Sequence, residues 1–197
     1  GMMSERLSLV LFMILIIFIF SMDLPGRIKY IIVPIILILH FSLLFYHFNS
    51  ALKKLNRDAM QINETAEYIP EESIVLPIDM TGNWLQPHFS NYLGTDRNLI
   101  LLENYEASVG WFPVTWDTID SPAILLGSRS HICGITWPGN INSNKERQID
   151  FIFLYGQTSQ IDEPAWQDLQ KVISEEFSGV YFSDNDYIRL FRRKLNE

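Results

Sequence analysis

The sequence predicts an α/β protein: an N-terminal transmembrane helical hairpin followed by a small three-layer α/β domain with a mostly parallel sheet. Two apolar runs, residues 7–22 and 30–48, predict the hairpin. Apolar strands that alternate with helical patterns predict the α/β domain. The expected division is a hairpin over residues 1–48, a helical stalk over 49–70 and a soluble domain over 71–197.

Both apolar runs have about the length of a membrane span. Residues 7–22 hold no ionisable side chain, and residues 30–48 hold only His40 and His47. A helix rises about 1.5 Å per residue, so roughly 20 residues cross the apolar core of a bilayer. A cleaved signal peptide and a buried hairpin in a soluble protein are the alternatives. The first would need small residues at its cleavage site and the second a polar stripe, and neither feature is present.

The part of the chain that follows the hairpin is acidic. Beyond residue 48 it holds 21 acidic and 12 basic side chains. This balance argues against a nucleic-acid partner, because phosphate binding needs a basic face. Cys133 is the single cysteine, which excludes an internal disulfide. Basic residues beside the two runs favour a cytoplasmic soluble domain, although only by a small margin.

A helical stalk is expected directly after the second run. Apolar residues recur at steps of three and four between Phe45 and Ile69, which keeps one seam on one side of a helix, and Pro70 ends it. The seam predicts packing onto the following domain. The alternative is a helix of another chain, which would give a homo-oligomer through residues 45–69.

The soluble domain is expected to alternate strands and helices. The sequence predicts helices over residues 82–92 and from Asp162, with Gly179 closing the second. The predicted strands cover residues 73–79, 99–102, 149–155, 180–182 and 187–191. The last two strands are expected to pair across the turn at residues 183–186, and Pro77 suggests an edge position or an early end for the first strand.

The candidate functional residues follow the carboxyl ends of the first two strands, where ligands usually bind in α/β sheets. Aromatic rings with amides and carboxylates between them would suit a glycan. The candidate catalytic residues are Glu103, Glu106 and His88. The candidate ligand-binding residues are Asp79, Trp84, His88, Tyr92, Asn104, Tyr105 and Trp111.

Each candidate also has a structural interpretation. The tryptophans are typical of a core, and Glu103 and Glu106 are typical of ion pairs or loop caps. No metal is expected, because His88 and His131 lack a metal-binding spacing, and Cys133 near His131 is typical of a buried inert thiol. No catalytic signature and no cofactor motif is present, so no cofactor is expected.

Two strings, WLQPHFSNYLG from Trp84 and LLENYEASVGWFPVTW from Leu101, carry a family resemblance. Over residues 30–120 the chain resembles the carboxyl-terminal end of polytopic membrane proteins of Bacteroidetes-like bacteria, some of them glycosyltransferase-like. The resemblance implies a bacterial inner-membrane protein with a periplasmic α/β domain. It also implies an accessory part of a glycosyltransferase system, because no early catalytic loop precedes Leu7.

Three functions remain open from the sequence. The leading hypothesis is a membrane-anchored extracytoplasmic domain that binds or positions a glycan in envelope assembly without catalysis of its own. The expected partners are the lipid bilayer, a glycan and another polytopic membrane protein. A small glycan-active hydrolase or transferase that uses Glu103, Glu106 and His88 is the second hypothesis. The third is a structural module that docks onto other membrane helices.

Overall fold

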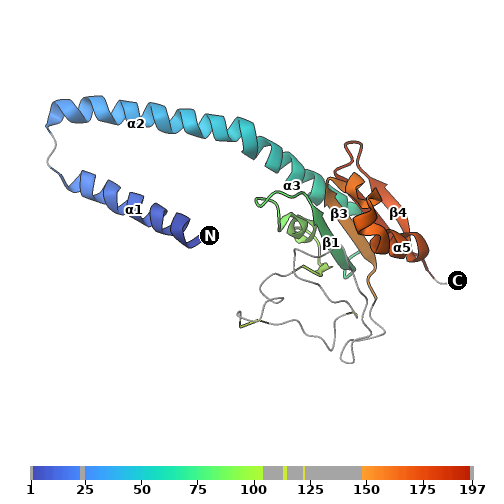
Figure 1. Ribbon diagram of the computed structural model, residues 1–197. Helices are drawn as coiled ribbons and strands as arrows, with labels where there is room; N and C mark the ends of the chain where they lie inside the picture. The colour runs from blue at the N-terminus through green and yellow to red at the C-terminus, as the bar shows by residue number, and fades with distance from the viewer. Residues whose placement is uncertain (1, 23–24, 104–112, 115–121, 123–147, 196–197) are drawn as a thin grey trace. The chain divides into compact units, whose positions relative to one another are not determined.

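The computed structural model describes residues 2–22, 25–103, 113–114, 122 and 148–195 (Figure 1). The chain forms two compact units, Gly1–Lys54 and Leu55–Glu197. The first unit is helical and the second contains the sheet.

The first unit holds helices α1, Met2–Ser21, and α2, Gly26–His47, and a π-helical segment, Phe48–Leu52. Within the described part of the chain, one helix is long and apolar enough to cross a membrane. It spans Tyr30–Tyr68, and its apolar window is not buried. Its place near the N-terminus fits a membrane anchor or a signal sequence. That α1 and α2 form a transmembrane hairpin stays a prediction.

The second unit contains a five-stranded sheet with the order β2-β1-β3-β5-β4. The strands are β1 (Ile74–Met80), β2 (Ile100–Leu101), β3 (Phe151–Gly156), β4 (Phe177–Phe182) and β5 (Ile188–Arg193). β1 runs parallel to β2 and β3, whereas β5 runs antiparallel to β3 and β4. The prediction of a mostly parallel sheet is therefore wrong, since the sheet is mixed. The reason is the place of β5, which lies between β4 and β3 and pairs antiparallel with both of them.

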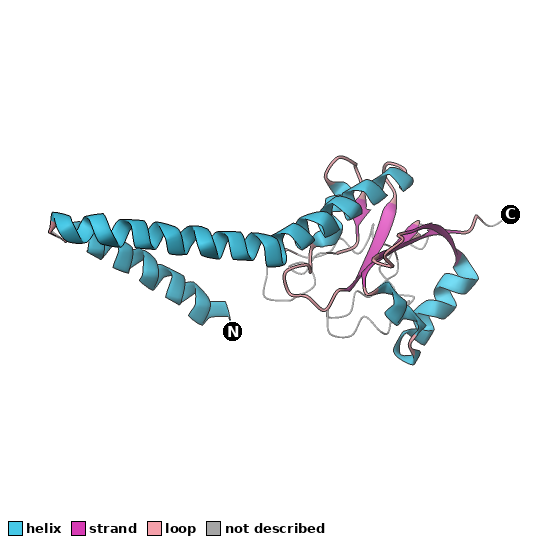
Figure 2. Cartoon of the chain, turned by 90° about the horizontal axis from the view of Figure 1, so that it is seen from above, coloured by secondary structure: helices cyan, strands magenta, loops and turns pink. Residues whose placement is uncertain are grey.

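Helices cover both faces of this sheet (Figures 1 and 2). Helix α3, Lys53–Thr65, places Ile62 in one cluster with Phe153 and Leu190. Helix α5, Gln167–Glu176, places Leu169 in a cluster on the other face. Successive strand residues point to opposite faces, so β1 and β3 contribute to both clusters. Burying a side chain such as that of Ile62 contributes roughly 1.5–3 kcal/mol to stability.

Part of the predicted stalk seam lies in the core. Ala59, Ile62, Ala66 and Ile69 are buried, whereas Phe45 is 72 % exposed. The helical residues end at Tyr68, just before Pro70. The carboxyl-terminal half of the seam therefore packs onto the domain that follows it.

Pro77 explains why β2 is short. The N–H of Leu102 donates to the carbonyl of Val75 at 2.9 Å, and the next bond of this parallel ladder would need an N–H at residue 77. Proline has none, so the ladder ends there. β1 thus lies between β2 and β3 rather than at the edge, but its pairing with β2 has the early end that Pro77 suggests.

The predicted helix over residues 82–92 is the clearest local difference. The structure has turns there, followed by a 3-10 helix, η3, over Phe89–Gly94. The prediction was wrong because short polar side chains near Thr81 bond to nearby main-chain groups and so compete with a regular helix. In the last third, α5 begins at Gln167, after a 3-10 turn at Pro164–Trp166, and ends at Glu176. Gly179 does not close this helix as predicted, because it lies in β4.

Candidate functional site

The candidate site is built on the segment that leaves the carboxyl end of β1. Asp79 Oδ1 accepts hydrogen bonds from the Thr81 N–H at 2.8 Å and from the Thr81 hydroxyl at 2.6 Å. The Asn83 N–H donates to Thr81 Oγ1 at 3.2 Å, and Gly82 between them has a φ of 60°. Glycine adopts this left-handed conformation without a steric penalty. The carboxylate of Asp79 therefore shapes a turn.

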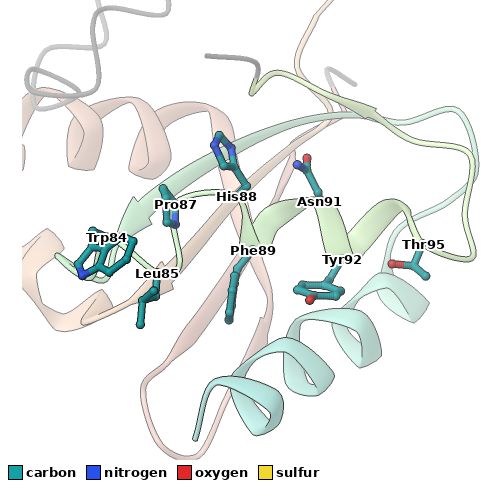
Figure 3. Close-up of a pocket in the computed structure, with 8 residues that line it drawn as sticks. All are labelled: Trp84, Leu85, Pro87, His88, Phe89, Asn91, Tyr92 and Thr95. Carbon is teal, nitrogen blue, oxygen red and sulfur yellow. The ribbon is translucent and has the colours of Figure 1, made fainter. Parts of the chain in front are cut away.

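A surface hollow of about 500 Å³ lies on the residues that follow this turn (Figure 3). Its lining consists of Trp84, Leu85, Pro87, His88, Phe89, Asn91, Tyr92 and Thr95. Trp84 is 75 % exposed and Tyr92 is 43 % exposed. The rings of Phe89 and Tyr92 meet edge to face with their centres 5.5 Å apart.

The segment that lines the hollow has an apolar and a polar side. In Figure 3, Leu85, Phe89 and Tyr92 point to one side of the segment, and His88 and Asn91 point to the other. Apolar and aromatic walls with a few polar groups are typical of sites for small organic ligands. A large aromatic ring that remains exposed, as Trp84 does, is also typical of recognition surfaces.

One carboxylate joins the polar side of this segment. Glu103 Oε2 accepts a hydrogen bond from the hydroxyl of Ser90, and Glu103 Oε1 lies 3.5 Å from His88 Nδ1. The side chain of Glu103 is 16 % exposed and that of His88 is 49 % exposed. Ser90 is fully buried, so its hydroxyl holds Glu103 and is not accessible as a nucleophile. The carboxylate can orient the imidazole of His88.

A buried polar cluster lies next to the hollow. Gln86 Nε2 donates to Asp58 Oδ2 at 2.8 Å and to the Tyr187 hydroxyl oxygen at 3.1 Å. Burial, followed by the negative charges of Asp58 and Asp79, raises the pKa of Tyr187 well above its ordinary value. The Tyr187 hydroxyl therefore keeps its proton at all physiological pH values.

The structure brings together some of the predicted site residues. Trp84, His88 and Tyr92 line the hollow, and Glu103 contacts His88. Asp79 holds the turn at the end of β1 and is not part of the lining. The remaining candidates, Asn104, Tyr105, Glu106 and Trp111, lie outside the described residues, as do His131 and Cys133.

Sequence reasoning missed Asp58 and Gln86. Asp58 lies four residues before Ile62 on the buried side of α3, so a carboxylate on an apolar helix face was the available signal. Nothing in the sequence marks Gln86 as buried, because a glutamine in a loop is usually exposed. Its two partners lie 28 and 101 residues away in the sequence.

Metal binding finds no support in the part of the chain that the structure describes. Over those residues, no group of three or more His, Cys, Asp or Glu side chains could hold a metal ion.

Comparison of the chain with models of protein families, with curated proteins and with solved structures finds no match in any of the three. The likeness to glycosyltransferase-like membrane proteins therefore stays a prediction, and the function is argued from the geometry.

Proposed function

We propose that the protein is a membrane-anchored, non-catalytic module of the bacterial cell envelope, and that its α/β domain binds a sugar ring of a glycan in the hollow at residues 84–95. The observation that carries this proposal is the open hollow with the exposed rings of Trp84 and Tyr92. In this role the domain positions a glycan for an assembly enzyme in the same membrane.

The residues that line the hollow include the two kinds of group that a sugar ring needs. A pyranose has apolar C–H faces, which pack on aromatic rings such as Tyr92, and hydroxyl groups around its rim. His88 and Asn91 supply hydrogen-bond donors and acceptors for those hydroxyls. A shallow site favours recognition of one or two rings within a longer chain.

An exposed apolar helix supports the membrane anchor. Its side chains include Ile36 and Leu39, each 57 % exposed. The apolar core of a bilayer would cover such side chains. The resemblance of the sequence supports a periplasmic location and a polytopic partner protein.

The binding proposal is tested with the full-length chain in lipid nanodiscs. Saturation-transfer NMR would be measured with methyl β-D-glucopyranoside and methyl N-acetyl-β-D-glucosaminide as ring probes. We expect a signal from at least one probe, and we expect Tyr92→Ala to remove most of it. Tyr68→Ala is the matched control, because Tyr68 is 48 % exposed but stacks on Tyr181, away from the hollow lining. No signal with either probe, or equal loss in both variants, would contradict the proposal.

The periplasmic location needs a separate test. Asp162 has a 73 % exposed side chain, so a cysteine placed there in a Cys133→Ser background is accessible to a reagent in the surrounding water. A membrane-impermeant maleimide should label Asp162→Cys in cells whose outer membrane has been opened. Labelling only after the inner membrane is lysed would place the domain in the cytoplasm.

The His88–Glu103 contact favours a second candidate function, a small glycan-active hydrolase or transferase. The distance of 3.5 Å between Glu103 Oε1 and His88 Nδ1 would let Glu103 orient the imidazole, which would act as a general base. Glu106 is the further carboxylate that the sequence suggests. Release of nitrophenol from nitrophenyl glycosides tests this candidate. Turnover that Glu103→Gln and His88→Gln both abolish would favour the enzyme over the binding module.

A further inference from the structure

The buried polar cluster beside the hollow connects residues from four separate elements. Asp58 comes from α3, Gln86 from the segment of the hollow, Tyr155 from β3 and Tyr187 from the residue before β5. Gln86 is 2 % exposed, Asp58 5 % and Tyr187 8 %. Polar side chains at this depth are stable only when they are hydrogen-bonded.

Gln86 is held through both its side chain and its main chain. Its amide donates to Asp58 at 2.8 Å and to Tyr187 at 3.1 Å. The hydroxyl of Tyr155 lies 3.4 Å from the carbonyl oxygens of both Gln86 and Pro87. The bond to Asp58 joins an amide donor to a buried carboxylate, which makes it the strongest kind of contact in this cluster.

The position of Gln86 in the chain links this cluster to the hollow. Its neighbours Leu85 and Pro87 both line the hollow. Its carbonyl accepts a hydrogen bond from the Phe89 N–H at 3.1 Å, at the start of the 3-10 helix that carries Tyr92. A shift of Gln86 would therefore move residues on both sides of it.

We propose that Asp58, acting through Gln86, is a positioning residue that holds residues 84–95 in the arrangement that presents Trp84 and Tyr92. This inference rests on the proposed function, because it names what prepares the hollow for a sugar ring. Asp58 itself is not part of the lining. A site whose residues are held before the ligand arrives loses less conformational entropy on binding.

Three variants of the full-length chain in nanodiscs separate positioning from general stability. Asp58→Asn keeps the size of the side chain and an oxygen that can accept from Gln86, whereas Asp58→Leu removes the acceptor and puts a somewhat larger apolar side chain in its place. Gln61→Ala is the matched control, because Gln61 also ties α3 to the domain, through a paired amide contact with Asn185 at 3.1 and 3.2 Å, but does not touch Gln86.

Hydrogen exchange provides a readout that needs no ligand. We expect Asp58→Leu to speed exchange of the Phe89 and Asn91 amides by about tenfold or more while β1 and β3 keep their protection. Asp58→Asn and Gln61→Ala should leave exchange at these amides as in the wild-type chain. Unchanged exchange in Asp58→Leu, or equal acceleration in Gln61→Ala, would overturn the inference.

A double variant keeps the test valid if Asp58→Leu does not fold. Asp58→Leu with Gln86→Leu removes both partners of the bond between them, so that neither leaves the other unpaired, and part of the lost stability is recovered. We expect fast exchange at Phe89 and Asn91 to remain in this double variant. Wild-type protection there would show that Asp58 does not position the segment.

The sugar probes distinguish this inference from the proposed function. Faster exchange in Asp58→Leu together with a weaker signal from methyl β-D-glucopyranoside or methyl N-acetyl-β-D-glucosaminide supports both. Faster exchange together with a probe signal that Tyr92→Ala does not change would contradict the sugar site and leave the link between Asp58 and the segment standing.

Discussion

Gly156 lies against the main chain of Met80, its partner in the parallel pairing of β3 with β1. A Cβ at position 156 would come within 2.5 Å of the carbonyl carbon of Met80. Gly156 also has a φ of 110°, which side-chain-bearing residues rarely adopt. The turn that leads to the hollow begins at this contact, so a glycine at position 156 allows the close approach at the end of β1.

We therefore expect Gly156→Ala to destabilise the domain by about 3 kcal/mol or more, from backbone strain together with the clash. Thermal unfolding of the full-length chain in detergent micelles measures the effect. Gly82→Ala is the control for conformation alone, because its φ is 60° and no atom lies within 4 Å of the place that a Cβ would take there. Gly82→Ala should lower the free energy of unfolding by about 1–2 kcal/mol. Equal losses in the two variants would show that the contact with Met80 does not matter.

Ser90 is expected to contribute to stability through Glu103. The Ser90 hydroxyl is fully buried and donates to a carboxylate that is 16 % exposed. Ser90→Ala removes that bond, at an expected cost of about 1–3 kcal/mol in the free energy of unfolding by urea. Ser174→Ala, at an exposed serine of α5 that bonds the carbonyl of Lys171 at 2.8 Å, should cost less. A loss in Ser90→Ala no greater than in Ser174→Ala would contradict the prediction.

The turn between β4 and β5 should make stability depend on pH. Desolvation raises the pKa of Asp186, but hydrogen bonds from Thr158, Arg189 and Ser159 and the charge of Arg189 outweigh it, so the pKa lies below the ordinary value of 3.8. A lowered pKa stabilises the fold above the unfolded pKa, and this contribution is lost as the pH falls through the folded pKa.

Asp186→Asn tests this dependence. Asp186 has a φ of 54°, which asparagine also tolerates. The substitution therefore removes the charge and keeps the backbone conformation. The variant should unfold at lower urea than the wild type at pH 7, and the difference should shrink below pH of about 3.8. Asp184→Asn, at an exposed residue of the same turn, is the control. A difference that does not change with pH would rule out the charge of Asp186 as its cause.

The apolar helix should keep the chain in the membrane fraction. Ile36→Lys places a charge near the middle of α2, Gly26–His47, at a cost to insertion of about 2.5–3.5 kcal/mol. We expect less of this variant in the membrane pellet after an alkaline wash. Met60→Lys, at a position of α3 that is 56 % exposed, should remain in the pellet like the wild type. A wild-type chain that stays in solution without detergent would contradict the anchor.

The parts of the fold that follow from local pattern could be predicted from the sequence. Apolar runs located β1 and β3, and the alternation around the turn at residues 183–186 located β4 and β5 as a pair. The strand directions could not be derived fully, because β5 pairs with β3, from which it is separated by α5 and β4. The helix predicted from residue 82 does not form, because side chains around Thr81 accept hydrogen bonds from nearby main-chain N–H groups.

The site shows the same division between local and distant signals. The density of aromatic residues after β1 pointed to Trp84, His88 and Tyr92, which line the hollow. The burial of Gln86 could not be predicted, because it depends on Asp58 and Tyr187, and only the folded chain brings these two residues together.

β4 is the last strand in the order of the described sheet, and its pairing with β5 shifts register between Gly179 and Tyr181. Residues 177–182 carry no charged side chain and no proline, the usual features that keep an outer strand from recruiting a neighbouring molecule. Val180 is the extra residue at this shift, and such a bulge interrupts the even spacing of main-chain donors and acceptors that intermolecular pairing requires. A bulge of this kind on an outer strand opposes edge-to-edge pairing between copies of a sheet, which is the contact that strand aggregation uses.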